Sequence, residues 1–262
     1  MADKNFEFLR LEINGEGIAK LTLTRAEKHN AFNEHVIAEL IDALQQIKGQ
    51  AKLLVLQADG KSFSAGADLD WMKRMADFDF EQNVQDANGL ANMLHALYTL
   101  PMPTIAKVQG NAYGGGVGLV ACCDLVVASE QAQFCLSEVK LGLIPATISP
   151  YVIKAVGAKV ARRLFVTAEV FNAEQAQRWN LVSEFVPVDH LDAAIDGWIE
   201  KIQKNSPAAI TAAKHLIEEV SNHSLNEELI ALTSRRIAEA RVSPQGREGV
   251  KAFLEKRKPL WT

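Results

Sequence analysis

Short apolar runs alternate with longer stretches of helical spacing along the 262-residue chain. Phe6–Ile13 and Ile18–Thr24 are rich in β-forming residues and are separated by a polar, glycine-containing turn, which predicts a hairpin. Apolar residues recur at helical spacing over Val36–Ile47, with Asn33 placed to cap that helix. The continuous apolar run Leu53–Ala58 is typical of a strand buried on both faces. Strand, helix and strand in this order indicate a parallel α/β arrangement.

The later part of the chain is predicted to become helical. A long helix over Glu81–Leu100 precedes another buried strand, Thr104–Val108. Beyond Pro150 the pattern is mostly helical: Ser206–Pro207 predicts one helix start, and Ser224–Glu227 predicts a capping box at another. Because repeats of solenoid period and Pro/Gly-rich linkers are lacking, a second independent domain is not expected.

Two segments of small residues follow buried strands. Gly114–Gly116 stands between a strand-like run and a predicted helix, so its backbone amides are exposed at a helix N-terminus. Such donors suit a phosphate or an oxyanion that develops during a reaction. Lys61–Leu69 follows Leu53–Ala58 in the same way, and ligands bind at such strand ends in α/β folds. Glu138 follows the strand-like run Ala132–Leu136, where an acid or base could stand near these donors.

Composition and charge remove several classes of function. A net charge of −4 provides no broad basic field for nucleic acid, and no apolar run is long enough to cross a bilayer. The N-terminus shows no apolar signal region, so a cytoplasmic protein is expected. Neither H-E-x-x-H nor G-x-S-x-G is present, and no metal site is expected. The three cysteines are interpreted as reduced core residues: Cys122, Cys123 and Cys135.

Several segments, in their order and intervals, together resemble the crotonase superfamily, also called the enoyl-CoA hydratase/isomerase family. The resemblance extends over nearly the whole chain. Each segment alone is a weak match, but the set is specific. The matching segments are Asn30-Ala31-Phe32-Asn33, Phe63–Leu69 (F-S-A-G-A-D-L), Gly110–Leu119 (G-N-A-Y-G-G-G-V-G-L), Cys123-Asp124, Ser137-Glu138, Leu141–Pro145 and Glu248–Pro259 (E-G-V-K-A-F-L-E-K-R-K-P).

The resemblance implies a fold, an assembly and a substrate. The fold is an α/β spiral of ββα units over residues 1–200, followed by a helical region over residues 201–262 that takes part in trimer formation and in closing the CoA site. The assembly is a homotrimer or a dimer of trimers. The substrate is an acyl thioester of coenzyme A, so CoA is part of the substrate and no separate cofactor is expected.

The resemblance also implies roles for individual residues. The thioester oxygen is expected between the backbone amides of Ala67 and Gly115, which agrees with the two segments of small residues inferred above. Losing one such donor costs roughly 3 to 4 kcal/mol of transition-state stabilisation. The residues expected along the adenine and pantetheine path, or in the tail that often reaches CoA, are Ala65, Asp68, Leu69, Phe253 and Lys256.

The acid–base groups limit the choice of reaction. Glu138 matches one of the two glutamates used by the hydratases, whereas Gly118 stands where the other would be. Hydration needs water activated for attack at the β carbon and a proton delivered to the α carbon, so one carboxylate must do both. An isomerase needs only one carboxylate to move a proton between the α and γ carbons. Hydration is the favoured interpretation and isomerisation the alternative.

Three segments resemble one branch of the family. Ala146–Tyr151, together with Gly114–Asp124 and Asp70–Arg74, looks similar to bacterial methylglutaconyl-CoA and carboxygeranoyl-CoA hydratases of leucine and acyclic terpene breakdown. On this view Gly118 makes room for a branched acyl chain, and Thr147 and Ser149 hydrogen-bond a distal carboxylate. The substrate would then be a branched or carboxylated enoyl-CoA such as methylglutaconyl-CoA.

Interpretations of another class are RNA binding and a catalytically silent homologue. A eukaryotic relative of the methylglutaconyl-CoA hydratases binds RNA through a lysine-lined helix. The corresponding helix here, from Glu34 to Lys48, carries acidic residues and has lysine only at its end. Its charge opposes RNA binding, so an acyl-CoA is expected as partner rather than nucleic acid or a membrane.

Overall fold

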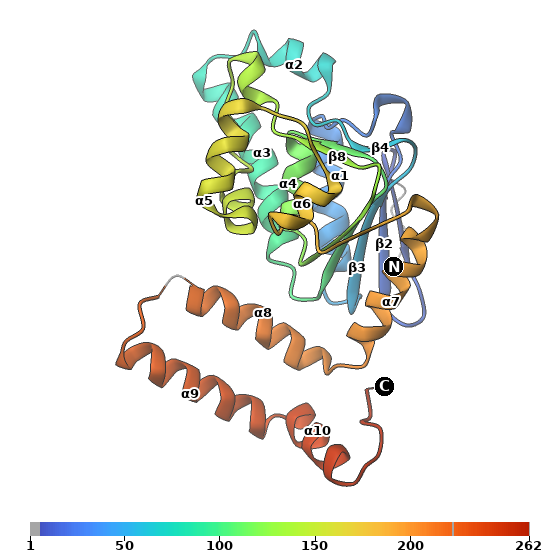
Figure 1. The fold of residues 1–262 in the computed structure, drawn as a ribbon, viewed down its shortest axis with the longest axis vertical. Coiled ribbons are helices and arrows are strands. Elements are labelled where there is room, and N and C mark those ends of the chain that lie inside the picture. The colour runs from blue at the N-terminus through green and yellow to red at the C-terminus, as the bar shows by residue number, and fades with distance from the viewer. Residues whose placement is uncertain (1–5, 222, 262) are drawn as a thin grey trace. The chain divides into compact units, whose positions relative to one another are not determined.

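The computed structural model describes residues 6–221 and 223–261 (Figure 1). The chain divides into two compact units. Among the described residues, the first unit comprises 6–100 and 104–195, and the second comprises 101–103, 196–221 and 223–261. The division falls within α7 (Leu191–Gln203), close to the boundary at residue 200 expected from the family resemblance.

A six-stranded sheet with the order β1-β2-β3-β5-β7-β10 forms the centre of the first unit. The predicted hairpin is present, because β1 is antiparallel to β2, and the other neighbouring strands are parallel. The inner strands are almost completely buried, as their continuous apolar runs predicted. The strands are β1 (Leu9–Ile13), β2 (Ile18–Leu23), β3 (Leu53–Ala58), β5 (Thr104–Val108), β7 (Leu125–Ser129) and β10 (Glu184–Val186).

A smaller sheet with the order β4-β6-β8-β9 accompanies it, and β4, β6 and β8 are parallel to one another. Each of these three strands directly follows a strand of the larger sheet: β4 follows β3, β6 follows β5 and β8 follows β7. A helical segment comes next in each case, which gives the repeated ββα unit that the family resemblance implies. The strands are β4 (Ser62–Ser64), β6 (Asn111–Tyr113), β8 (Gln133–Cys135) and β9 (Phe171–Asn172).

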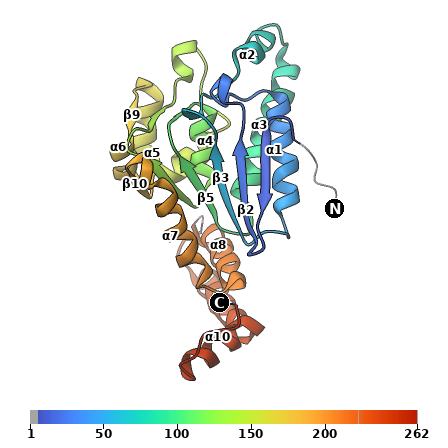
Figure 2. The same ribbon diagram turned by 90° about the vertical axis from the view of Figure 1, so that its right-hand side faces the viewer.

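Helices of the first unit pack in sequence order, α1 against α3, α3 against α4 and α4 against α5 (Figure 2). The predicted cap of α1 is confirmed, because Asn33 Oδ1 accepts the Val36 N–H at 2.9 Å. The short helix α4 is apolar on every side and lies in the core. The helices are α1 (Glu34–Ile47), α2 (Leu69–Met75), α3 (Phe80–Tyr98), α4 (Gly115–Cys122), α5 (Ser149–Thr167) and α6 (Ala173–Arg178), with 3₁₀ turns at Ala26–Lys28, Glu138–Leu141 and Val188–His190.

Local details differ from the sequence-based expectations in two places. The short helix α2 was not predicted, because its seven residues show too little of an apolar repeat. The predicted capping box at Ser224–Glu227 is wrong: Asn226 is the N-cap, and its Oδ1 accepts the Leu229 N–H at 2.9 Å. Asn226 is the cap rather than Ser224, because asparagine is a strong N-cap residue and this one stands directly before the first helical residue.

The second unit consists of helices (Figure 1). Within it, Thr211 Oγ1 donates to the Pro101 carbonyl oxygen at 3.0 Å, and Lys214 Nζ donates to the Met102 carbonyl oxygen at 2.8 Å. No helix among the described residues is both long and apolar enough to cross a membrane. Besides the end of α7, the helices are α8 (Pro207–Ser221), α9 (Glu227–Val242) and α10 (Pro244–Leu254).

Candidate active site

Two segments of small residues lie side by side at the ends of β4 and β6. These strands pair in parallel, with Ser64 opposite Ala112, so the residues that follow them run next to each other. A Cβ atom on Gly66 would lie 2.9 Å from the Tyr113 carbonyl oxygen, and the φ angle of Gly66 is +86°. Only glycine adopts this conformation readily, and its lack of a side chain lets the two backbones approach.

Ala67 lies in extended backbone beside Phe32. The Phe32 N–H donates to the Gly66 carbonyl oxygen at 2.7 Å, and the Asp68 N–H donates to the Phe32 carbonyl oxygen at 2.7 Å. Because Ala67 is the residue paired with Phe32 in this parallel bridge, its own N–H points away from Phe32. Among the described residues that N–H has no acceptor, and Ala67 is exposed. It can therefore donate to an oxygen atom of a ligand.

A second donor stands at the start of α4. Gly114 is the N-cap with a φ angle of +51°, and its carbonyl oxygen accepts the Val117 N–H at 2.9 Å. The N–H groups of Gly115 and Gly116 belong to the first turn and have no acceptor in the part of the chain that the structure describes. The helix dipole makes this end favourable for negative charge.

Glu138 begins the 3₁₀ turn that follows β8, and β8 pairs in parallel with β6. The Gly114 N–H donates to the Cys135 carbonyl oxygen at 2.9 Å, which holds this segment against the glycine triplet. Glu138 Oε1 lies 3.4 Å from the position of a Cβ atom on Gly114. Its Oε2 is buried without a hydrogen-bond partner among residues 6–221 and 223–261. Burial raises the pKa of the Glu138 carboxyl, partly opposed by its own backbone N–H.

The arrangement therefore combines two unpartnered amide donors with a half-buried carboxylate, one oxygen of which is fully buried. Donors of this kind stabilise an oxyanion, and a carboxyl whose pKa is raised above its ordinary value is a stronger base when ionised and is suited to moving protons. The structure brings together the segments that carry Ala67, Gly115 and Glu138, three residues that come from three different turns of the spiral. Their roles in catalysis stay predictions.

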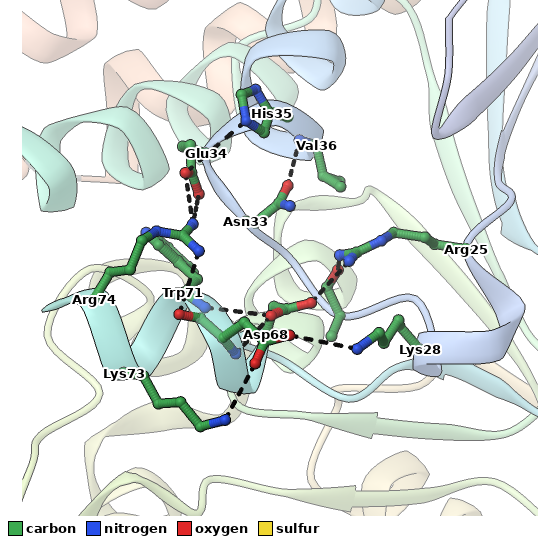
Figure 3. A network of polar contacts seen from close by, with 12 residues as sticks. Arg25, Lys28, Asn33, Glu34, His35, Val36, Asp68, Trp71, Lys73 and Arg74 are labelled. Carbon is green, nitrogen blue, oxygen red and sulfur yellow. Dashed lines mark hydrogen bonds and ion pairs between the residues drawn. The ribbon is translucent and has the colours of Figure 1, made fainter.

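Asp68 orders the segment that follows Ala67 (Figure 3). Its Oδ1 accepts the N–H groups of Asp70 at 2.8 Å and Trp71 at 3.3 Å, so it is the N-cap of α2. Its Oδ2 lies 2.9 Å from Arg25 Nη2, and Arg25 Nη1 donates to the Ala31 carbonyl oxygen at 3.1 Å. This largely buried ion pair ties the chain before α1 to the segment that carries Ala67.

Replacing Asp68 with asparagine is expected to lower the free energy of unfolding by about 3 kcal/mol, because the largely buried Arg25 charge loses its partner. Burial by itself would raise the pKa of the Asp68 carboxyl, but the amides of Asp70 and Trp71 and the Arg25 guanidinium hold it below its ordinary value. A lowered pKa stabilises the folded state above the unfolded-state pKa, and this stabilisation disappears as the pH falls through the folded-state value. Urea titrations at neutral and acidic pH should therefore show the two proteins converging in acid.

Asp70→Asn provides the matched control for this experiment. Asp70 pairs with the exposed amines of Lys73 and Lys28, so its replacement should change the free energy of unfolding by less than about 0.5 kcal/mol. If both variants lose the same free energy of unfolding, the ion pair between Arg25 and Asp68 does not stabilise the fold more than an exposed pair does.

Gly118 lies inside α4, and the space beside it is filled. A Cβ atom there would lie 2.4 Å from Ile148 Cγ2 and 3.4 Å from Leu94 Cδ2. The expectation that Gly118 makes room for a branched acyl chain is therefore wrong, because the Ile148 side chain takes that space. The position that corresponds to the second glutamate of the hydratases is occupied here by a glycine that packs against the apolar side chain of Ile148.

The remaining predicted binding residues of the first unit lie near these segments along the chain. Ala65 is exposed beside Gly66, and Leu69 is 73% exposed at the start of α2. Thr147 is half-buried and precedes Ile148. Ser149 Oγ donates to the Ala146 carbonyl oxygen at 2.8 Å, so its hydroxyl hydrogen is already engaged. Binding of CoA or of a distal carboxylate by these residues stays a prediction.

Phe253 and Lys256 belong to the second unit, which is described separately from the first. Phe253 lies in α10 with 83% of its surface exposed, and Lys256 follows the helix with a φ angle of +54°. Their expected contact with CoA stays a prediction.

Sequence reasoning missed Arg25 and Ile148 as residues that shape the site. Neither belongs to one of the segments of small residues, and their partners are distant in the sequence, so no local signal could have identified them. The fully buried Ser64 did carry a signal, its place in such a segment. Its hydroxyl donates to the Asn30 carbonyl oxygen at 2.9 Å and accepts the Gly66 N–H at 3.2 Å.

Cys122, Cys123 and Cys135 form no disulfide; Cys122 and Cys135 are buried and Cys123 is half-buried. Burial raises the pKa of the Cys122 thiol well above its ordinary value, which keeps it protonated and unreactive. The described residues contain no group of histidine, cysteine, aspartate and glutamate that could hold a metal ion.

Known proteins resemble this chain in both sequence and structure. A crystal structure of an enoyl-CoA hydratase from Shewanella pealeana gives a TM-score of 0.94 at 46% identity, covering 98% of this chain and 96% of that one. The enoyl-CoA hydratase structure from Mycobacterium smegmatis gives 0.91 at 33% identity, covering 97% and 98%. The mevalonyl-coenzyme A hydratase of Aspergillus fumigatus is 35% identical over 93% of this chain and 91% of its own length.

The chain also matches a family model over almost its whole length. The model described as enoyl-CoA hydratase/isomerase matches residues 13–262, which includes both segments of small residues and Glu138. The spiral of ββα units agrees with the fold of the matching structures. The chain is therefore a member of the enoyl-CoA hydratase/isomerase family, within the crotonase superfamily.

Proposed function

We propose that this protein is an enoyl-CoA hydratase that adds water across the α,β double bond of an acyl-CoA thioester. The observation that carries the proposal is the Glu138 carboxylate, which lies against Gly114 beside unpartnered amides and has a buried oxygen without a partner. A carboxylate in this state is suited to moving protons next to a polarised carbonyl. The hydratases among the similar proteins support the same reaction class.

In this proposal the amides of Ala67 and Gly115 bind the thioester oxygen and stabilise the negative charge that develops on it. The Glu138 carboxylate accepts a proton from water while the water oxygen bonds to the β carbon. The π electrons move onto the thioester, giving an enolate. The protonated Glu138 then donates to the α carbon as the carbonyl re-forms, which restores the carboxylate. One residue thus performs both transfers.

The absence of a carboxylate at position 118 favours isomerisation as a second candidate. Because Ile148 fills the space beside Gly118, no acid–base group stands there to activate water separately. An isomerase would use Glu138 alone to remove a proton from one carbon of the acyl chain and return it two carbons away. The same amides would stabilise the intervening dienolate.

A branched or carboxylated acyl chain, such as that of methylglutaconyl-CoA, is the proposed substrate. The support is the resemblance of Asp70–Arg74, Gly114–Asp124 and Ala146–Tyr151 to hydratases of such chains, together with the half-buried position of Thr147. One relative, 35% identical to this chain, is named a mevalonyl-coenzyme A hydratase. Because the mevalonyl group is branched, this relative supports a branched substrate.

The function is tested with purified protein and a panel of straight, branched and carboxylated enoyl-CoA esters. Chromatography that separates hydrated from isomerised product distinguishes the two reactions directly. Hydration with a preference for branched or carboxylated chains is the expected result. If none of the esters is hydrated or isomerised, both candidates are wrong.

The pH dependence of the reaction should report Glu138. Because burial raises the pKa of this carboxyl above its ordinary value of 4.5, the fraction ionised and able to accept a proton rises only at higher pH. We expect kcat/KM to increase with pH through an apparent pKa above 4.5, measured under subsaturating substrate in buffers of constant ionic strength. A profile already flat at pH 4.5 would contradict this assignment.

A homotrimer or dimer of trimers is also part of the proposal. Helices of the second unit expose large apolar side chains, which favours their burial against another subunit. Light scattering coupled to size-exclusion chromatography would measure the mass, and a monomer would contradict the proposal. The exposed apolar residues of these helices include Ile217, Ile230, Ile237, Val250 and Phe253.

A further inference from the structure

We propose that Phe32 is a positioning residue that fixes the spacing between the two amide donors of the site. The inference rests on the proposed function, because it takes the N–H groups of Ala67 and Gly115 as the donors to the thioester oxygen. Phe32 itself is 1% exposed and lies between the two segments of small residues, so it acts through them.

The backbone of Phe32 holds the first donor. Both of its hydrogen bonds, with the carbonyl of Gly66 and the N–H of Asp68, are 2.7 Å long and flank Ala67 on either side. Two bonds to adjacent peptide groups fix both the position and the direction of the Ala67 N–H. The next residue, Asn33, caps α1, which anchors this short stretch to a helix.

The ring of Phe32 supports the second donor. A Cβ atom on Gly115 would lie 2.8 Å from Phe32 Cε2 and 3.1 Å from Cδ2, so the ring packs directly against the Gly115 backbone. Any side chain at position 115 would displace the ring. Glycine is therefore required here by contact with Phe32 as well as by the need for a close approach of the substrate.

Phe32 is thus in contact with both donor segments, through its main chain on one side and its ring on the other. The ring is planar and has only two side-chain torsions, so it is a rigid spacer. Ser64 reinforces the arrangement: its hydroxyl accepts the Gly66 N–H, and its carbonyl oxygen lies 2.7 Å from the position of a Cβ atom on Gly116. The packing of Phe32 and Ser64 against the two donor segments therefore sets the distance between the donors.

Replacing Phe32 with leucine should lower kcat by about 100-fold and leave KM within about threefold, because a donor displaced by about 1 Å loses most of its effect on the transition state. Phe32→Met is the second variant, because its flexible side chain fills a similar volume without a rigid plane. Phe171→Leu is the matched control. Phe171 is also 1% exposed, but it stacks on Phe134 within the smaller sheet and meets Trp179 at the end of α6 in a tilted ring contact.

A second measurement does not depend on turnover. Butyryl-CoA labelled with ¹³C at the thioester carbonyl can be neither hydrated nor isomerised, and isotope-edited infrared spectra of its complex report polarisation of that carbonyl. We expect a lowered stretching frequency in the wild-type complex. In Phe32→Leu and Phe32→Met the frequency should move back toward that of the free ester, whereas in Phe171→Leu it should stay lowered.

The outcomes separate this inference from the proposed function. Wild-type protein that polarises the carbonyl but neither hydrates nor isomerises any ester refutes the proposed reaction and leaves the role of Phe32 intact if its variants lose the shift. An unchanged carbonyl frequency and kcat in a folded Phe32 variant overturns the inference. Equal losses in the Phe32 and Phe171 variants overturn it too, because any loss of core volume would then suffice.

Discussion

Replacing Glu138 with glutamine is expected to lower kcat by about 10²- to 10⁴-fold while affinity for acyl-CoA is kept. Glutamine preserves the shape of the side chain, but it cannot accept a proton from water or return one to the α carbon. Steady-state kinetics with the best ester of the panel measure the loss. Calorimetric titration with a saturated acyl-CoA tests whether binding is retained.

The same variant should be more stable than the wild type at neutral pH. Because burial raises the pKa of the Glu138 carboxyl, ionisation costs more in the folded state than in the unfolded chain. The neutral glutamine avoids that cost, so its Tm should be higher at pH 7. The difference should vanish as the pH falls below the ordinary value of 4.5, where the carboxyl is protonated in both states.

Glu130→Gln is the control for both measurements. Glu130 is an exposed residue in the turn between β7 and β8, on the same ββα unit as Glu138. Its replacement should leave kcat and Tm unchanged. If Glu138→Gln keeps wild-type turnover, the carboxylate is not the acid–base group, and another residue moves the proton.

Introducing the missing carboxylate by Gly118→Glu is expected to destabilise the protein by about 3 kcal/mol or more. Overpacking alone costs about 1 to 3 kcal/mol, and a buried carboxylate without a partner adds to it. The cause is Ile148, whose Cγ2 would lie 2.4 Å from the new Cβ atom. Chemical denaturation measures the loss, and activity per folded molecule should not rise, because the carboxylate cannot reach a productive position.

A compensating replacement provides the control. Ile148→Ala alone leaves a cavity and should cost about 2 to 5 kcal/mol, but it removes the atoms that oppose a side chain at position 118. The double variant Gly118→Glu, Ile148→Ala should therefore be more stable than the sum of the single changes predicts, by about 0.5 to 3 kcal/mol. Strict additivity would show that Ile148 does not fill the space beside Gly118.

Much of the architecture could be predicted from periodicity and from the family resemblance. Local patterns predict the hairpin, α1 with its Asn33 cap and the buried strands β3 and β5. A strand buried on both faces has a continuous apolar run, and an amphipathic helix has apolar residues at helical spacing after a capping residue. The segments that carry Ala67 and Gly115 were recognisable for the same reason: small residues directly after a buried strand mark close backbone approaches.

The contacts that shape the site could not be predicted in this way. The Arg25–Asp68 ion pair and the packing of Ile148 on Gly118 join residues that are distant in the sequence and belong to no periodic pattern. Position 118 illustrates the problem. A glycine in place of a larger residue suggests open space, but whether a neighbour fills that space depends on side chains that only the folded chain brings near.

The parallel order of β4, β6 and β8 divides the work of the site among consecutive turns of the spiral. The first two turns end in the segments with amide donors, which would activate any thioester carbonyl, and the third ends in Glu138. In the proposed function, carbonyl activation and proton transfer are therefore encoded in separate stretches of sequence. If that function holds, redesign of the residues after β8 alone offers a route to a new reaction on the same class of ester, with the two amide donors left in place.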